Sequence, residues 1–88
     1  MQKTIQRTVL VTGASSGIGK ATALKLLNQG YCVYASARNP TRLESLAANG
    51  AKILQLDVTQ EQSMQNSVDR IIDESGRLDI LINNAGYG

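Results

Sequence analysis

A glycine-rich segment near the beginning of the chain limits the possible folds more than any other part of the sequence. Residues 12–19 read TGASSGIG and stand between an apolar run at 8–11 and a helical pattern at 20–28. Glycine reaches backbone angles that other residues avoid, so the chain can turn tightly after a strand. The following helix would offer its unpaired N–H groups and the positive end of its dipole to an anion. The segment therefore predicts a turn that binds phosphate.

The spacing of the glycines separates three interpretations of this turn. Three glycines within seven residues, placed between a strand and a helix, disfavour a plain Gly/Ser turn. A Walker-type loop needs four residues between its glycines and a hydroxyl after its lysine, but five separate Gly13 from Gly19, and Ala21 follows Lys20. A dinucleotide-binding turn remains, with the spacing G-x-x-x-G-x-G in place of the usual G-x-G-x-x-G.

Strand and helix patterns alternate along the rest of the chain. Runs of apolar residues and strand formers predict strands at 8–12, 31–37, 52–56 and 78–83. Helical spacing predicts helices at 18–28, from 39–40 to about 49, and at 59–75. Asn39 is expected to cap the second helix, and Thr59 with Gln62 to form a capping box at the third.

This β-α-β-α-β-α-β order predicts an α/β fold. We expect a Rossmann-type doubly wound parallel sheet, partial, with strand order 3-2-1-4. One NAD(P)-binding segment would occupy residues 1–88 and be truncated after the fourth strand.

Composition argues against several classes of function. The net charge is only +2, there is no basic run, and the only aromatic residues are three tyrosines, so we expect no nucleic-acid partner. Cys32 is the only cysteine and histidine is absent, so neither a disulfide nor a metal site is expected. No apolar run approaches the roughly 20 residues of a membrane span. The first seven residues lack an apolar signal core, and we expect a cytoplasmic chain.

The predicted strand ends carry groups suited to a dinucleotide, which binds along this edge of a doubly wound sheet. Ser15 and Ser16 in the glycine turn could bond phosphate. After the second strand comes Arg38, and no acidic residue lies between Gly19 and Glu44. A guanidinium suits a 2′-phosphate, whereas an NAD site normally places a carboxylate here, so NADP is favoured over NAD.

Motifs at all four strand ends resemble the short-chain dehydrogenase/reductase family. The family's T-G-x-x-x-G-[IL]-G pattern is matched at 12–19 and its N-N-A-G pattern at 83–86. The resemblance implies that Asp57 accepts a hydrogen bond from the adenine amino group and that Val58 packs on the ring. The residues expected at the cofactor are Gly13, Ser15, Ser16, Gly17, Ile18, Gly19, Arg38, Asp57, Val58, Asn84, Ala85 and Gly86.

The family's catalytic residues have no counterpart in these 88 residues. They are a Tyr, a Lys four residues later, a Ser and a further Asn, all downstream of N-N-A-G, and no tyrosine here has a lysine at that spacing. The resemblance implies an NADP(H)-binding N-terminal segment of an oxidoreductase that acts on an alcohol or carbonyl substrate, with the fragment itself inactive. A non-catalytic dinucleotide-binding or interaction module is the alternative. The apolar fourth strand, open at the sheet edge, predicts self-association.

Overall fold

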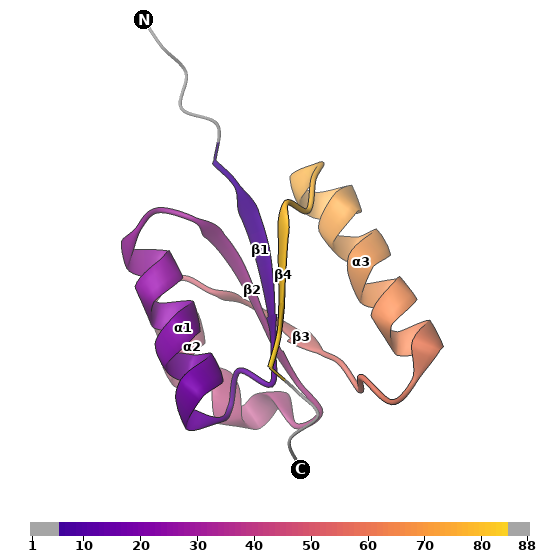
Figure 1. The fold of residues 1–88 in the computed structure, drawn as a ribbon, viewed down its shortest axis with the longest axis horizontal. Coiled ribbons are helices and arrows are strands. Elements are labelled where there is room, and N and C mark those ends of the chain that lie inside the picture. The colour runs from indigo at the N-terminus through magenta and orange to yellow at the C-terminus, as the bar shows by residue number, and fades with distance from the viewer. Residues whose placement is uncertain (1–5, 85–88) are drawn as a thin grey trace, which may run out of the picture.

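Strands and helices alternate through residues 6–84, the part of the chain that the computed structural model describes (Figure 1). The strands are β1 (Thr8–Thr12), β2 (Cys32–Ala37), β3 (Lys52–Gln55) and β4 (Ile80–Asn83). The helices are α1 (Gly17–Asn28), α2 (Glu44–Ala48), which follows the short 3-10 helix η1 (Pro40–Leu43), and α3 (Glu61–Ser75).

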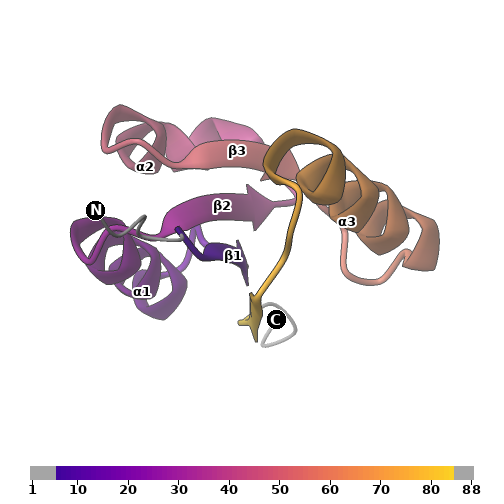
Figure 2. The same ribbon diagram turned by 90° about the horizontal axis from the view of Figure 1, so that it is seen from above.

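The four strands form one parallel sheet in the order β3-β2-β1-β4, which confirms the predicted order and fold class (Figure 2). Val9 of β1 lies opposite Val33 of β2 on one side and Ile80 of β4 on the other. Every residue of β1 is buried, as expected of an inner strand that is covered on both faces. β3 and β4 are the two edges of the sheet.

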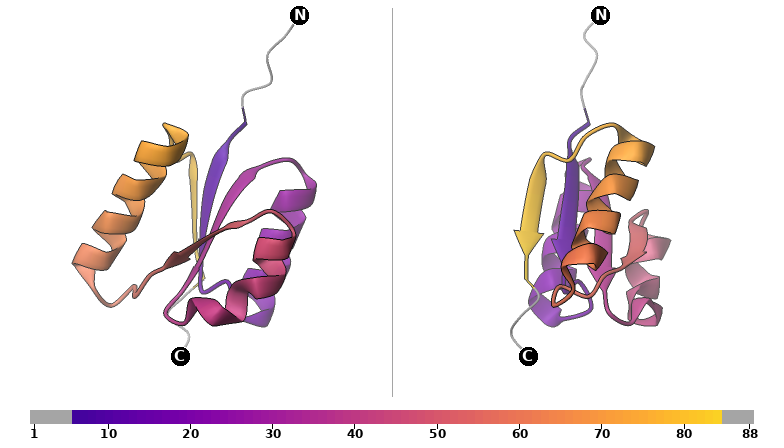
Figure 3. Two further views of the ribbon diagram at one scale, coloured as in Figure 1. Left: turned by 180° about the vertical axis from the view of Figure 1, so that it is seen from behind. Right: turned by 90° about the vertical axis from the view of Figure 1, so that its right-hand side faces the viewer.

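Helices cover both faces of the sheet. α1 and α2 lie on one side and α3 on the other (Figure 3). Successive residues of a strand point to opposite faces, so β1 contributes to two cores. Val9 and Val11 belong to the larger cluster, beneath α1 and α2, whereas Leu10 packs with Tyr34 and Ile71 beneath α3.

Hydrogen bonds from a buried tyrosine attach the end of α3 to the sheet. The Tyr34 hydroxyl donates to Oε1 of Glu74 at 2.9 Å and lies 2.7 Å from Oγ of Ser75. The tyrosine ring is fully buried, and Nζ of Lys52 stands 5.3 Å from its centroid. This contact involves the middle of β2 and the first residue of β3, away from the carboxyl ends of the strands.

The beginning of α3 differs from the prediction. The backbone N–H and the hydroxyl of Thr59 both donate to Oδ1 of Asp57, at 3.0 and 2.6 Å. The helix starts two residues later, with Gln60 at the N-cap position and no side-chain cap. The predicted capping box is therefore wrong, because the hydroxyl of Thr59 is bonded to Asp57 in an aspartate turn and does not cap the helix. Asn39 caps η1, the 3-10 helix that begins the predicted second helix, since its Oδ1 accepts the N–H of Thr41. The α-helical part, α2, begins after Leu43 without a side-chain cap.

Candidate functional site

The carboxyl ends of all four strands lie at one edge of the sheet, because the strands are parallel. This edge is at the bottom of Figure 1, where β1 passes into α1. Gly13 follows β1, Arg38 follows β2, and Asn84 follows β4, while Asp57 lies two residues beyond β3. The fold thus brings together one motif from each strand end, which is where doubly wound sheets bind ligands.

The glycine turn leaves the start of α1 open. Gly13 has a φ of 62°, a left-handed conformation that favours glycine. The first turn of α1 carries no acidic residue, so no side chain there offsets its partial positive charge. A Cβ on Gly17 would meet nothing within 4 Å, and Ile18 is 75% exposed. The arrangement can accept an anion directly on backbone N–H groups.

The two serines of the turn have different environments. Oγ of Ser16 accepts hydrogen bonds from the N–H of Gly19 at 3.3 Å and from Nδ2 of Asn84 at 3.0 Å. It also donates to the carbonyl oxygen of Gly13 at 2.9 Å. Ser16 therefore caps α1 and holds the turn together. Ser15 is exposed, and its hydroxyl makes no hydrogen bond within residues 6–84, so it is the hydroxyl that a ligand could use.

A hydrogen-bond network ties the end of β4 to the glycine turn. The buried Thr12 hydroxyl donates to Oδ1 of Asn83 at 2.8 Å and accepts the N–H of Asn84 at 3.0 Å. Thr12 and Asn83 carry this network although neither was among the expected cofactor residues. Both residues lie within the matched motifs at 12–19 and 83–86. The motifs therefore pointed to these two positions, but the sequence did not show that their side chains bond to each other. Ala85 and Gly86 lie outside the described residues.

Close packing explains why residue 19 is glycine. A Cβ there would stand 2.7 Å from Nδ2 of Asn84 and closer still to the carbonyl oxygen of Gly13. Real Cβ atoms are not found at such distances, and most of the obstruction is backbone. Gly19 therefore lets the first turn of α1 lie against both the preceding turn and the end of β4.

A depression of about 290 Å³ lies at the ends of β2 and β3. Its lining residues are Arg38, Gln55, Asp57, Gln60 and Ser63. The hydroxyl and the N–H of Thr59, and more weakly the charge of Arg38, hold the pKa of Asp57 below its usual range. A cation and a carboxylate thus face the same depression. Val58 is half-buried and packs against the core beneath α3.

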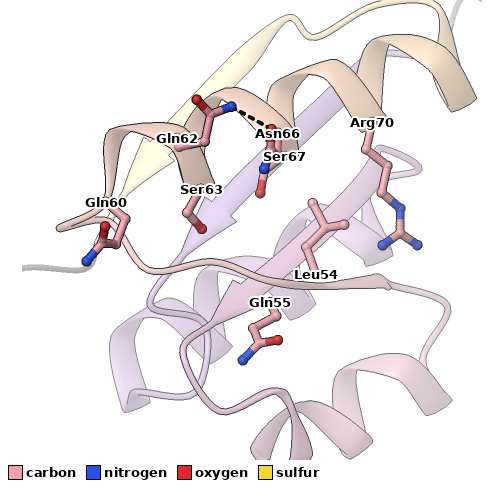
Figure 4. Close-up of a pocket in the computed structure, with 8 residues that line it drawn as sticks. All are labelled: Leu54, Gln55, Gln60, Gln62, Ser63, Asn66, Ser67 and Arg70. Carbon is pink, nitrogen blue, oxygen red and sulfur yellow. Dashed lines mark hydrogen bonds between the residues drawn. The ribbon is translucent and has the colours of Figure 1, made fainter.

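A larger groove of about 460 Å³ adjoins this depression, between β3 and α3 (Figure 4). Several of its polar groups bond to one another or to neighbours: Gln62 to Asn66 at 2.8 Å and Arg70 to Glu74 at 2.9 Å. The groove extends along α3, away from the other strand ends. The smaller depression, and not this groove, is lined by Arg38 and Asp57, two of the residues predicted at the cofactor.

No helix within residues 6–84 is long and apolar enough to span a membrane. Those residues also contain no cluster of three His, Cys, Asp or Glu side chains that could hold a metal ion.

The fold and the glycine turn together define a doubly wound α/β protein of the nucleotide-binding kind. The family model for short chain dehydrogenases matches residues 7–88, and the chain belongs to this family. Oxidoreductases of the family bind nicotinamide dinucleotides.

Curated relatives agree with this assignment. The chain is 48% identical over 80 residues to 3-ketodihydrosphingosine reductase of Bacteroides thetaiotaomicron, covering 91% of the chain and 28% of that relative. It is 36% identical over 85 residues to an NADPH-dependent pterin aldehyde reductase of Arabidopsis thaliana, covering 91% and 35%. The chain thus spans about a third of the length of these relatives.

Solved structures show the same fold. A short-chain dehydrogenase from Streptomyces avermitilis superposes with a TM-score of 0.88 at 36% identity, over 93% of this chain and 31% of that one. YwfH, an NADPH-dependent reductase involved in bacilysin biosynthesis, gives a TM-score of 0.86 at 36% identity, over 96% and 39%.

Proposed function

We propose that the strand-end edge binds NADP(H) in preference to NAD, as the cofactor site of an oxidoreductase acting on an alcohol or carbonyl substrate. The preference for NADP over NAD depends on Arg38. It is an exposed cation in the depression at the end of β2, and no acidic residue lies between Gly19 and Glu44. A carboxylate at this point would bond a ribose 2′-hydroxyl, whereas a guanidinium forms charge-assisted bonds with a phosphate.

The glycine turn supports the pyrophosphate end of this proposal. The start of α1 has free N–H groups and no acidic side chain in its first turn. Gly17 adds no side chain to the space above it, so a phosphate can approach the backbone. Ser15 can donate its hydroxyl, whereas Ser16 acts by capping the helix. The exposed side chain of Ile18 would pack against a ring face of the bound dinucleotide.

Asp57 and Val58 support the adenine end. Oδ1 of Asp57 is occupied by Thr59, while Oδ2 accepts no hydrogen bond within residues 6–84. The carboxylate is charged at neutral pH, and its lowered pKa keeps it charged in weak acid as well, so it can accept an adenine N–H. Val58 lies next to it and offers an apolar surface for the ring.

Bound nicotinamide would supply the hydride chemistry, and the residues of this segment bind and orient the dinucleotide. Asn84 fixes the end of β4 against the glycine turn, because its Nδ2 is bonded to Ser16. Ala85 and Gly86 remain sequence-based predictions. Relatives described as NADPH-dependent, the pterin aldehyde reductase and YwfH, are consistent with the choice of cofactor.

A charge reversal at Arg38 tests the cofactor choice. Loss of a charge-assisted hydrogen bond removes about 1.5–3 kcal/mol, so Arg38→Asp should weaken NADP binding roughly ten- to a hundred-fold. NAD binding should be unchanged or improved. The matched control is Arg42→Asp, which makes the same charge change on η1 at an exposed residue outside the depression. Fluorescence titration of both cofactors measures the result, and equal NADP affinity in the two variants would contradict the proposal.

A further inference from the structure

A side chain from β3 bonds to the backbone of Arg38. Gln55 is the last residue of β3 and lies opposite Ala37, the last residue of β2. The N–H of Leu56 donates to the carbonyl oxygen of Ala37 at 3.0 Å. Beyond this point β2 ends, and Nε2 of Gln55 donates to the carbonyl oxygen of Arg38 at 3.2 Å. The glutamine thus adds one hydrogen bond between the two segments where the ladder stops.

The residues on both sides of Arg38 are also held. Ala37 is buried in the core. Asn39 accepts the N–H and the hydroxyl of Thr41 at 3.3 and 2.6 Å, which fixes the start of η1. The bond from Gln55 therefore restrains the peptide between two fixed neighbours. That restraint limits the directions in which the Arg38 side chain can leave the backbone.

The direction matters because the arginine side chain is long. A small rotation of its backbone moves the guanidinium a large distance, and a mobile side chain loses more conformational entropy when it binds. Gln55 also lines the depression that holds Arg38 and Asp57. In Figure 4, Gln55 points away from α3 while Leu54 points toward it, as alternation along a strand requires. Gln55, at the carboxyl end of β3, thus lines both this depression and the groove along α3.

We propose that Gln55 is a positioning residue, which holds the backbone of Arg38 so that its guanidinium meets the 2′-phosphate of the dinucleotide. It strengthens the binding of dinucleotides that carry a 2′-phosphate. It contributes nothing to the binding of the parts that NADP and NAD share. The inference rests on the proposed function.

The test replaces the hydrogen-bond donor without changing side-chain length. Gln55→Met in the purified protein should weaken NADP binding about three- to ten-fold, the range expected when one long side chain must be ordered on binding instead of being held beforehand. NAD binding should stay the same. Gln65→Met is the matched control: it removes a glutamine hydrogen bond to Asp69 on the exposed face of α3 and should change neither affinity. Gln55→Ala serves as a second variant lacking the donor.

A double variant separates positioning from direct contact. In the Arg38→Asp background, Gln55→Met should cause no further loss of NADP affinity, because the glutamine acts through the arginine. An equal loss in both backgrounds would overturn the inference, and so would a parallel loss of NADP and NAD affinity. A wild-type protein without preference for NADP would instead refute the proposed function, so the two failures are distinguishable.

Discussion

Two glycines of the same turn should respond in opposite ways to substitution by alanine. In Gly19→Ala the new methyl group would stand 2.7 Å from Nδ2 of Asn84 and 3.0 Å from the carbonyl carbon of Gly13, with the carbonyl oxygen nearer still. The carbonyl oxygen of Gly13 accepts hydrogen bonds from the N–H and the hydroxyl of Ser16 at 3.2 and 2.9 Å, so this peptide has little freedom to move aside. In Gly17→Ala the methyl group meets nothing within 4 Å.

The magnitudes follow from these contacts. Overpacking costs about 1–3 kcal/mol, and contact with backbone places Gly19→Ala toward the upper end. Replacing a helical glycine by alanine returns roughly 0.5–1 kcal/mol. We expect Gly19→Ala to lose about 2 kcal/mol of unfolding free energy and Gly17→Ala to lose none or to gain up to about 1 kcal/mol.

Urea unfolding, followed by circular dichroism, measures both variants against the parent protein. The midpoint should fall for Gly19→Ala and be unchanged or higher for Gly17→Ala, with similar slopes for all three. Cofactor titration adds a second comparison, because the methyl group of Gly17→Ala enters the space proposed for phosphate. That variant should bind NADP more weakly although it is at least as stable. Equal stability of the two variants would refute the packing argument at Gly19.

Two further predictions concern Asp79, which directly precedes β4, and Leu81 within β4. Oδ2 of Asp79 accepts the N–H of Thr8 at 2.8 Å, and Arg77 bonds both carboxylate oxygens. Arg77 and then the N–H of Thr8 hold the pKa of Asp79 below its ordinary value of 3.8, so its contribution to stability is present above pH 3.8 and is lost as the pH falls through the lowered pKa. The stability gap between the parent protein and Asp79→Asn should therefore be largest near pH 7 and close in acid, as urea midpoints would show; a gap independent of pH would contradict it. Leu81 is 49% exposed on this edge strand, and we expect the chain to self-associate there. Leu81→Lys should shift light-scattering mass toward the monomer more than Ile72→Lys, the same change at a 44% exposed residue of α3, and a monomeric parent protein would show the prediction to be wrong.

The sequence alone determined the architecture of residues 6–84. Local signals carry this information: glycine position, apolar runs and helical spacing define the elements, and short crossovers between parallel strands allow few strand orders. The same signals located Gly13, Arg38, Asp57 and Asn84 at strand ends, because the end of a strand is a property of the sequence nearby.

Tertiary structure alone decided which polar groups are available. Ser15 and Ser16 are adjacent and chemically identical, yet the second is occupied by Asn84, 68 residues further along the chain. The bond from Gln55 to Arg38 crosses between two strands. Competition among hydrogen-bond partners depends on distances that only the assembled sheet defines, and for this reason no local pattern could predict these assignments.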